Sequence, residues 1–188
     1  MNLLYPNLQW RWLPTMLRYA LLGSIVAGGY GIIYDQITYS ISPEYFTRLK
    51  FSQFHYADFG FPRRVFVGEI GLLATWWVGF VAGWFVARIA VPAFSPRTAR
   101  LHASRAFLTI LAFALTASII GYFLGLLRRS NPDFSSWEGF ATNRGIRDLP
   151  NFVRVAYIHN ASYLGGLVGL VAAIIRLKRR QQADQAIA

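Results

Sequence analysis

The sequence contains no cysteine among its 188 residues. This absence excludes disulfide scaffolds, thiolate nucleophiles, cysteine-bound zinc and iron–sulfur clusters. Acidic residues are also scarce, with 8 Asp and Glu against 19 Lys and Arg, and charged residues together make up only 14% of the chain. An average soluble protein carries about 25% charged residues. The sequence therefore lacks the charge that normally covers the surface of a water-soluble domain.

What the chain has in excess is apolar residues, at 55% of the sequence with a mean hydropathy of +0.36. A helix that crosses a bilayer requires about 20 mainly apolar residues. The stretches that meet this requirement are 16–34, 65–91, 106–127 and 155–175. We expect an all-α polytopic membrane protein, a four-transmembrane-helix bundle that forms one membrane domain over 1–188. Its long outer links are 35–64 and 128–154.

The basic residues flank these stretches, where Lys and Arg anchor helix ends and contact anionic lipid headgroups. This placement argues against nucleic acid as the partner of a chain with a charge of +11. Lys and Arg divide almost evenly between the two sides of the membrane. The side that holds both termini is shorter, however, and it ends in the basic residues Arg176, Lys178, Arg179 and Arg180. By the positive-inside rule we expect both termini in the cytoplasm.

Small residues recur four positions apart in every apolar stretch. In lipid, such spacing lets two helix backbones approach closely, which is how membrane helices associate. The first stretch carries Gly23, Ala27 and Gly31. The other stretches carry the pairs Gly79 and Gly83, Gly121 and Gly125, and Gly165 and Gly169. These glycines predict helix packing, and therefore a compact bundle, rather than ligand binding.

The sequence contains a faint internal repeat at an offset of about 90 residues. Arg64 precedes the second stretch as Arg154 precedes the fourth, and Glu69 and His159 stand five residues beyond each arginine. A duplicated two-helix unit would form a parallel repeat about the membrane normal. Chance similarity between apolar segments remains the competing explanation.

Four polar residues lie at or inside the ends of the apolar stretches: Asp35, Glu69, His159 and Asn160. Ionisable groups inside a membrane span are costly, and they commonly mark proton or ion sites. A histidine near carboxylates can bind a metal or relay a proton. The spacing matches no metal-binding motif, so we assign no metal. The favoured interpretation is structural, with Glu69 paired to a neighbouring arginine such as Arg64 and His159 donating a hydrogen bond inside the bundle.

The first outer link has the most distinctive sequence. The alternation of Ile37, Tyr39 and Ile41 predicts a short extended segment. Ser42 followed by proline and an acid then predicts a helix start, continuing to about Phe54 as a short interfacial helix that exposes Phe46, Phe51 and Phe54 beside Arg48 and Lys50. The candidate interaction residues of this link are Glu44, Tyr45, Phe46, His55 and Asp58. Gly139, Gly145 and Pro150 predict a looser loop in the second link.

Three strings in the first half of the chain carry a resemblance. They are Tyr34-Asp35-Gln36-Ile37-Thr38, Glu44-Tyr45-Phe46-Thr47 and Ala74-Thr75-Trp76-Trp77-Val78-Gly79. Together they resemble a family of uncharacterised bacterial four-helix membrane proteins, over the first two spans and their link. The resemblance implies a bacterial cytoplasmic (inner) membrane location and no particular reaction. In that family a histidine often stands in place of Tyr34, which argues against a metal site there.

Three classes of function fit these observations. The first is a non-catalytic scaffold, accessory subunit or lipid-interacting module that presents its outer links to a protein partner, and the lack of a catalytic motif favours it. The second is a proton or cation transporter or channel, and the third is an outer-leaflet membrane enzyme, both using Asp35, Glu69 and His159. We predict no cofactor, and membrane lipids as partners. Convergence of these residues beside a cavity would favour the second and third classes.

Overall fold

Four long helices dominate the computed structural model, which describes residues 9–130 and 133–187. They are α1 (Leu13–Ile41), α4 (Arg63–Ala93), α5 (Pro96–Ser130) and α7 (Leu149–Ile187). Each is long and apolar enough to cross a membrane. No strand occurs within the described ranges. The expected all-α fold with four membrane-spanning lengths of helix is therefore confirmed.

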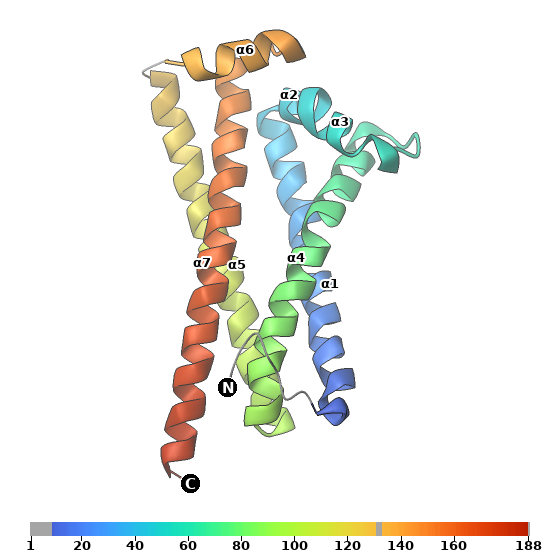
Figure 1. Cartoon of the computed structure of the whole chain (residues 1–188). Helices are drawn as coiled ribbons and strands as arrows, with labels where there is room; N and C mark the ends of the chain where they lie inside the picture. The colour runs from blue at the N-terminus through green and yellow to red at the C-terminus, as the bar shows by residue number, and fades with distance from the viewer. Residues whose placement is uncertain (1–8, 131–132, 188) are drawn as a thin grey trace.

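The long helices associate as two pairs, α1 with α4 and α5 with α7, and contacts between the pairs are sparser (Figure 1). The start of α1, the α4–α5 turn and the end of α7 lie at one end of the molecule, which we call the terminal end. The opposite link end carries the short helices between the long ones. These are α2 (Pro43–Tyr45), the π-helical turn η2 (Phe46–Lys50), α3 (Phe51–Gln53), the 3-10 turn η3 (His55–Ala57) and α6 (Ser135–Arg144).

Glycines set how closely the helices of each pair approach. A methyl group added at Gly79 of α4 would overlap the backbone carbonyl of Gly23 on α1. In the second pair, a methyl group at Gly121 would lie 2.6 Å from the carbonyl oxygen of Tyr157. The remaining glycines named from the sequence, Gly83, Gly125, Gly165 and Gly169, also face the partner helix of their pair. Close backbone packing, which small residues permit, thus holds each pair together.

The outward faces of the long helices are apolar. Only 22% to 39% of the most apolar stretch of each long helix is buried inside the protein. Leucine and isoleucine side chains such as Ile25, Ile33, Leu108 and Leu164 are 63% to 69% exposed. Apolar surface of this extent is unfavourable in water and suits a hydrocarbon environment. The molecule accordingly has the surface of a multi-pass membrane protein.

The long helices extend beyond the apolar stretches predicted from the sequence, so the first link is shorter than expected. Helix α1 continues to Ile41, so the expected extended segment at Ile37–Ile41 is wrong. The Thr38 hydroxyl donates to the carbonyl of Tyr34, and the ring of Tyr39 is buried against Phe46, so the alternating residues are held in helix. The predicted start at Ser42 is confirmed, because its hydroxyl accepts a hydrogen bond from the backbone of Tyr45.

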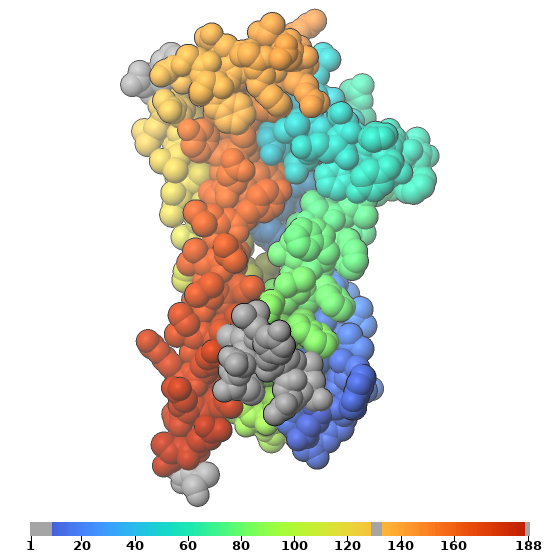
Figure 2. All heavy atoms as spheres, in the orientation of Figure 1, coloured from blue at the N-terminus to red at the C-terminus, as the bar shows by residue number. Residues whose placement is uncertain are grey.

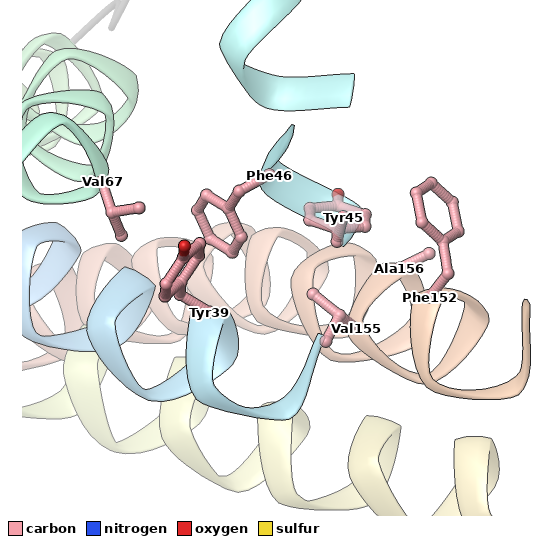
Figure 3. Packing of buried hydrophobic residues seen from close by; sticks show 7 residues of the cluster. All are labelled: Tyr39, Tyr45, Phe46, Val67, Phe152, Val155 and Ala156. Carbon is pink, nitrogen blue, oxygen red and sulfur yellow. The ribbon is translucent and has the colours of Figure 1, made fainter. Parts of the chain in front are cut away.

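The link end is more ordered and more buried than the sequence indicated. Phe46 is fully buried and Lys50 is 8% exposed, so the expectation that both lie on the surface is wrong. Phe46 belongs to a buried cluster that joins both helix pairs, here called the link-end cluster (Figure 3). It comprises Tyr39, Tyr45, Phe46, Val67, Phe152, Val155 and Ala156. The second link forms helix α6 rather than a loose loop, and the helix ends at Gly145, whose φ of 63° favours glycine.

Candidate functional site

A cavity of about 210 Å³ lies between the two helix pairs and is lined by all four long helices. Figure 2 shows the surface hollowed between α7 and α4, near the middle of their length. One part of the lining is polar and consists of Tyr30, Tyr34, Asp35, Thr75, His159, Ser162 and Tyr163. The other part is aliphatic and includes Val78, Ala82, Ile110, Leu111, Leu167 and Leu170. The cavity is therefore amphiphilic.

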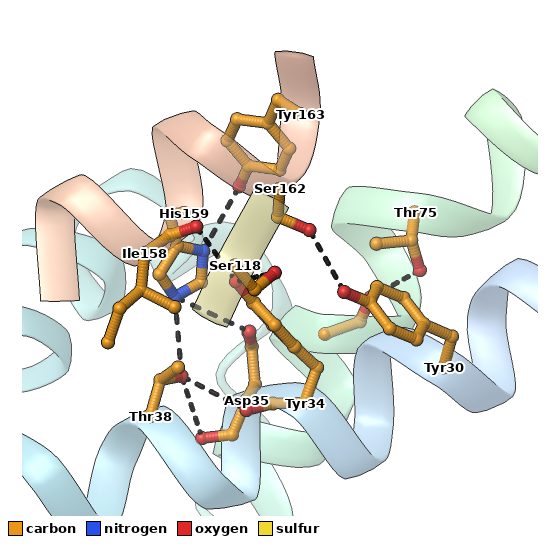
Figure 4. Close-up of polar contacts among 11 residues, drawn as sticks. Tyr30, Tyr34, Asp35, Thr38, Thr75, Ser118, Ile158, His159, Ser162 and Tyr163 are labelled. Carbon is orange, nitrogen blue, oxygen red and sulfur yellow. Dashed lines mark hydrogen bonds and ion pairs between the residues drawn. The ribbon is translucent and has the colours of Figure 1, made fainter. Parts of the chain in front are cut away.

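His159 of α7 is the centre of the polar part, and its side chain is only 2% exposed (Figure 4). Its Nε2 atom lies 3.2 Å from Oγ1 of Thr38 and 3.8 Å from Oδ1 of Asp35, both on α1. Its Nδ1 atom lies 3.4 Å from the hydroxyl of Tyr163, one turn further along α7. Both ring nitrogens therefore have a polar neighbour, as a buried imidazole requires.

The hydrogen bonds of Thr38 indicate which nitrogen of His159 carries the proton. The Thr38 hydroxyl donates to the backbone carbonyl of Tyr34 at 3.1 Å, so its oxygen is left to accept from Nε2–H. In a neutral imidazole the other nitrogen is then an acceptor. Nδ1 accordingly accepts from the hydroxyl of Tyr163, which lines the cavity. The result is a polarised chain that runs from the cavity through Tyr163 and His159 to Thr38.

Tyrosine and serine hydroxyls connect the two helix pairs around the cavity. The Tyr34 hydroxyl of α1 donates to the carbonyl of Ile158 on α7 at 3.0 Å and lies 3.1 Å from Oγ of Ser118 on α5. Tyr30 and Ser162 hydroxyls are 2.9 Å apart, again joining α1 to α7. Because direct helix packing between the pairs is sparse, these polar contacts help to fix their relative position.

Lys50 and Tyr45 cover the site from the link end. The Tyr45 ring stacks on the imidazole of His159, with ring centroids 5.0 Å apart, and Nζ of Lys50 lies 5.9 Å from the Tyr45 ring. Burial lowers the pKa of Lys50, although the nearby carboxylate of Asp35 opposes this. Burial also raises the pKa of the Tyr45 phenol. Lys50 is thus a buried cation close to the Asp35 and His159 pair.

The polar lining does not continue toward the terminal end. Beyond the cavity, the helices meet in an apolar cluster of Val86, Ile89, Ala103, Ala106, Ala173 and Leu177. Each of these side chains is at most 4% exposed. This apolar cluster interrupts the polar lining, although Arg88 of α4, 5% exposed, is also buried in the same half. The polar site belongs to the half of the molecule nearer the link end.

The structure brings Asp35 and His159 together but leaves the other members of the predicted polar cluster apart. Glu69 does not line the cavity, and its buried Oε2 atom has no hydrogen-bond partner among the described residues. Arg64, expected to pair with Glu69, instead donates to Gln36 and to Ser40. Asn160 is exposed on the outward face of α7. No group of residues suited to a metal ion occurs in the described ranges.

The candidate interaction residues of the first link have mostly internal roles. A carboxylate oxygen of Glu44 accepts hydrogen bonds from the backbone amides of Arg147 and Asp148, at 2.9 and 2.8 Å. Tyr45 and Phe46 are 6% and 0% exposed in the link-end cluster. Only His55 and Asp58 remain on the surface. The first link therefore closes the bundle and has few of the predicted residues left for a partner.

Several site residues were not anticipated from the sequence, namely Tyr30, Tyr34, Thr38, Ser162 and Tyr163. A signal for them existed. Tyr30, Tyr34 and Thr38 are spaced four apart and therefore share one face of α1, as His159 and Tyr163 share one face of α7. Hydroxyl groups on the inward face of a membrane helix need hydrogen-bond partners, and a polar stripe on a neighbouring helix can supply them.

The chain matches no protein-family model, no curated protein and no solved structure. Fold and geometry define its class as a helical protein with four membrane-spanning lengths of helix and one amphiphilic cavity between two helix pairs.

Proposed function

We propose that this chain binds the uncharged, oxygen-bearing head of a small amphiphile in the cavity between its helix pairs. The observation that carries the proposal is the division of the cavity lining into a hydroxyl- and imidazole-rich part and an aliphatic part. The first part supplies donors and acceptors for a carbonyl or hydroxyl group. The second accommodates a hydrocarbon chain, which is how membrane ligand sites combine orientation with affinity.

Size and charge narrow the class of ligand. A volume of about 210 Å³ is below the roughly 300–1,000 Å³ of pockets for drug-sized ligands, so the cavity suits a single ring rather than a larger ligand. No Lys or Arg lines the cavity among the described residues, so a phosphate head would lack a counter-charge. A ring with carbonyl or hydroxyl oxygens, of the quinone type, matches both restrictions. The Tyr163–His159 chain could then exchange a proton with the bound head.

The geometry favours this function over the other classes considered. A scaffold that presents the first link is less well supported, because Tyr45 and Phe46 are buried and Glu44 is engaged within the chain. A channel or transporter is less well supported, because an apolar cluster from Val86 to Leu177 follows the cavity toward the terminal end, where Arg88 is the buried charged residue of the described core. A membrane enzyme remains compatible, since a bound head beside an imidazole and a carboxyl is also the arrangement of an acid–base site.

The proposal includes a location and an orientation. We place the chain in the bacterial inner membrane, with both termini in the cytoplasm and the link end outside. The resemblance to bacterial four-helix proteins supports the membrane, and the basic residues near the end of α7 support the orientation. The short helices at the link end would then lie at the outer interface, and the ligand would enter from the outer leaflet.

We also propose that the bundle is a tandem duplication of one two-helix unit. Gly31 faces Gly71 in the first pair, and a shift of about 90 residues gives Gly121 and Ala161, which face each other in the second. Further matching contacts are Ala27–Thr75 with Ala117–Gly165, and Gly23–Gly79 with Phe113–Gly169. A common register across several contacts supports duplication more strongly than the sequence similarity does. Asp35 and His159 are not equivalent in this repeat, so the site combines different halves.

The decisive experiment uses a substitution that fills the cavity and leaves the helix contacts unchanged. A Cβ atom at Gly166 would meet no atom within 4 Å, and this glycine lines the cavity, so Gly166→Leu should block the ligand. Gly29 is equally open but lies outside the lining, and Gly29→Leu is the matched control. The measurement is equilibrium binding of a short-tailed benzoquinone to the purified protein in detergent.

We expect saturable binding to the wild type and to Gly29→Leu, and at least about tenfold weaker binding to Gly166→Leu, because an occupied cavity excludes the ring. His159→Gln should also weaken binding, because the chain from Tyr163 to Thr38 is interrupted. Equal affinities for the two leucine variants would place the ligand elsewhere. Absence of saturable binding to the wild type would reject the quinone-type head.

A further inference from the structure

A second site is indicated at the link end of the other helix pair, away from the cavity, by a buried arginine. Arg154 of α7 is 7% exposed, and its Nε and Nη2 atoms have no hydrogen-bond partner among the described residues. A buried guanidinium normally has its donors satisfied, because removing them from water without partners is costly. The unsatisfied donors of Arg154 therefore call for an acceptor that the described residues do not supply.

The packing around Arg154 fixes the position of its guanidinium. Its side-chain stem lies against Gly125 of α5, where an added methyl group would come within 2.6 Å of its Cγ atom. Its guanidinium carbon lies 5.5 Å from the ring centroid of Tyr122. The glycine makes room for the stem, and the aromatic ring supports the head. The guanidinium is thus held in place before any ligand arrives, which reduces the entropy lost on binding.

The equivalent arginine of the first helix pair shows how the same position is satisfied internally. Arg64 also lies over a tyrosine ring, that of Tyr39, at 4.7 Å. Its Nη atoms donate to the backbone carbonyl and side chain of Gln36 and to the hydroxyl of Ser40. Among the described residues, Arg64 thus has internal acceptors and Arg154 has none, although the two stand at corresponding places in the two pairs.

The surroundings of Arg154 favour an anion. A second basic residue, Arg128 of α5, lies at the same end of the pair: its Nε is 3.4 Å from the hydroxyl of Tyr157, three residues beyond Arg154 on α7. No carboxylate oxygen lies within 4 Å of the Arg154 guanidinium in the described part of the chain. A guanidinium binds phosphate oxygens through paired hydrogen bonds, and the end of a membrane-spanning helix lies at the depth of lipid headgroups.

We propose that Arg154 binds the phosphate of a phospholipid headgroup, in a site completed by Tyr122, Gly125 and Arg128. The site is separate from the cavity, which none of these four residues lines, so it does not depend on the ligand proposed there. Its lipid would cover the α5–α7 pair at the link end.

The test compares Arg154→Gln with the matched control Arg64→Gln. Protein stripped of lipid in detergent is titrated with phosphatidylglycerol, with diacylglycerol, which lacks the phosphate, and with inorganic phosphate, and bound molecules are counted by native mass spectrometry. We expect the wild type and Arg64→Gln to bind one phosphatidylglycerol about tenfold more tightly than Arg154→Gln does. Diacylglycerol should not distinguish the variants.

Arg154→Lys provides a second measurement if the glutamine variant does not fold, as judged by size-exclusion chromatography. Lysine keeps the charge but loses the paired donors, so its affinity for phosphatidylglycerol should lie below that of the wild type. Equal affinity of wild type and variants for phosphatidylglycerol would overturn the proposal. Tight, Arg154-dependent binding of inorganic phosphate without lipid binding would overturn the lipid as the source of the phosphate.

Discussion

Lys50 shows how one residue can be placed by an irregular turn of backbone. In a regular α-helix, the side chain one turn beyond Tyr45 would be that of Leu49. The π-helical turn η2 widens the spacing, so Lys50 takes that place, with its Nζ beside the Tyr45 ring and close to the Asp35 carboxylate. A lysine at this position carries a cost, because its positive charge is withdrawn from water.

That cost predicts a pH dependence of stability. Burial lowers the pKa of Lys50 below its usual value of about 10.4, so the unfolded chain binds this proton more tightly than the folded chain does. Raising the pH toward about 10 should therefore stabilise the fold. We expect the thermal midpoint of the wild type to rise between pH 7 and about 9.5 relative to that of Lys50→Met, measured by circular dichroism in detergent.

The titration of Tyr45 sets the upper limit of the pH range over which Lys50 should raise stability. Its pKa is raised by burial, so the stability that it contributes is present at neutral pH and is lost only above its unfolded pKa of about 10. Lys50→Met is the control for every other titrating group, because it keeps the length of the side chain without the charge. Parallel pH profiles of the two proteins would show that Lys50 is not buried as a cation.

At the scale of the helices, packing within each pair depends on backbone contact rather than on interlocking side chains. Gly31 and Gly71 face each other so closely that a methyl group on either would overlap the carbonyl of the other. Gly29 lies on the same helix, two residues away, and a methyl group there would meet nothing within 4 Å. Alanine at Gly29 therefore changes only helix propensity, whereas alanine at Gly31 also disturbs the contact between α1 and α4.

We expect Gly31→Ala to destabilise the protein by about 1–3 kcal/mol, because the added methyl group forces α1 and α4 apart. Gly29→Ala should be neutral or stabilising by up to about 1 kcal/mol, because alanine favours helix over glycine. The thermal midpoints of the two variants in the same detergent provide the comparison. A larger loss for Gly29→Ala than for Gly31→Ala would contradict the helix contact described here.

The same scale shows what the sequence could and could not predict. Apolar length and glycine spacing are local patterns, so they predicted the four helices and the residues at their contacts. Phe46 and Lys50 resembled surface residues because amphipathic patterns assume regular α-helical spacing, which the π turn breaks. The partners of His159, from Thr38 of α1, depend on how one helix pair docks on the other, which no local pattern contains.

At the scale of the whole molecule, two tight helix pairs meet loosely around a polar cavity and are closed at the link end by an aromatic cluster. The two ends of the molecule differ in the polarity of their cores. Most buried polar residues of the described core lie near the link end, whereas the terminal end has an apolar cluster with Arg88 as its buried charged residue. The proposed entry of a ligand from the outer leaflet therefore depends on which end faces out.

The absence of native cysteine makes this orientation directly measurable. Ser52 in α3 and Gln182 near the end of α7 are both exposed and lie at opposite ends of the molecule. We expect a membrane-impermeant maleimide to label Ser52→Cys in intact bacterial cells and Gln182→Cys only after the inner membrane is disrupted. The cysteine-free wild type measures background labelling. Labelling of Gln182→Cys alone in intact cells would reverse the orientation, and with it the leaflet from which the cavity and Arg154 are reached, because both lie in the half nearer the link end.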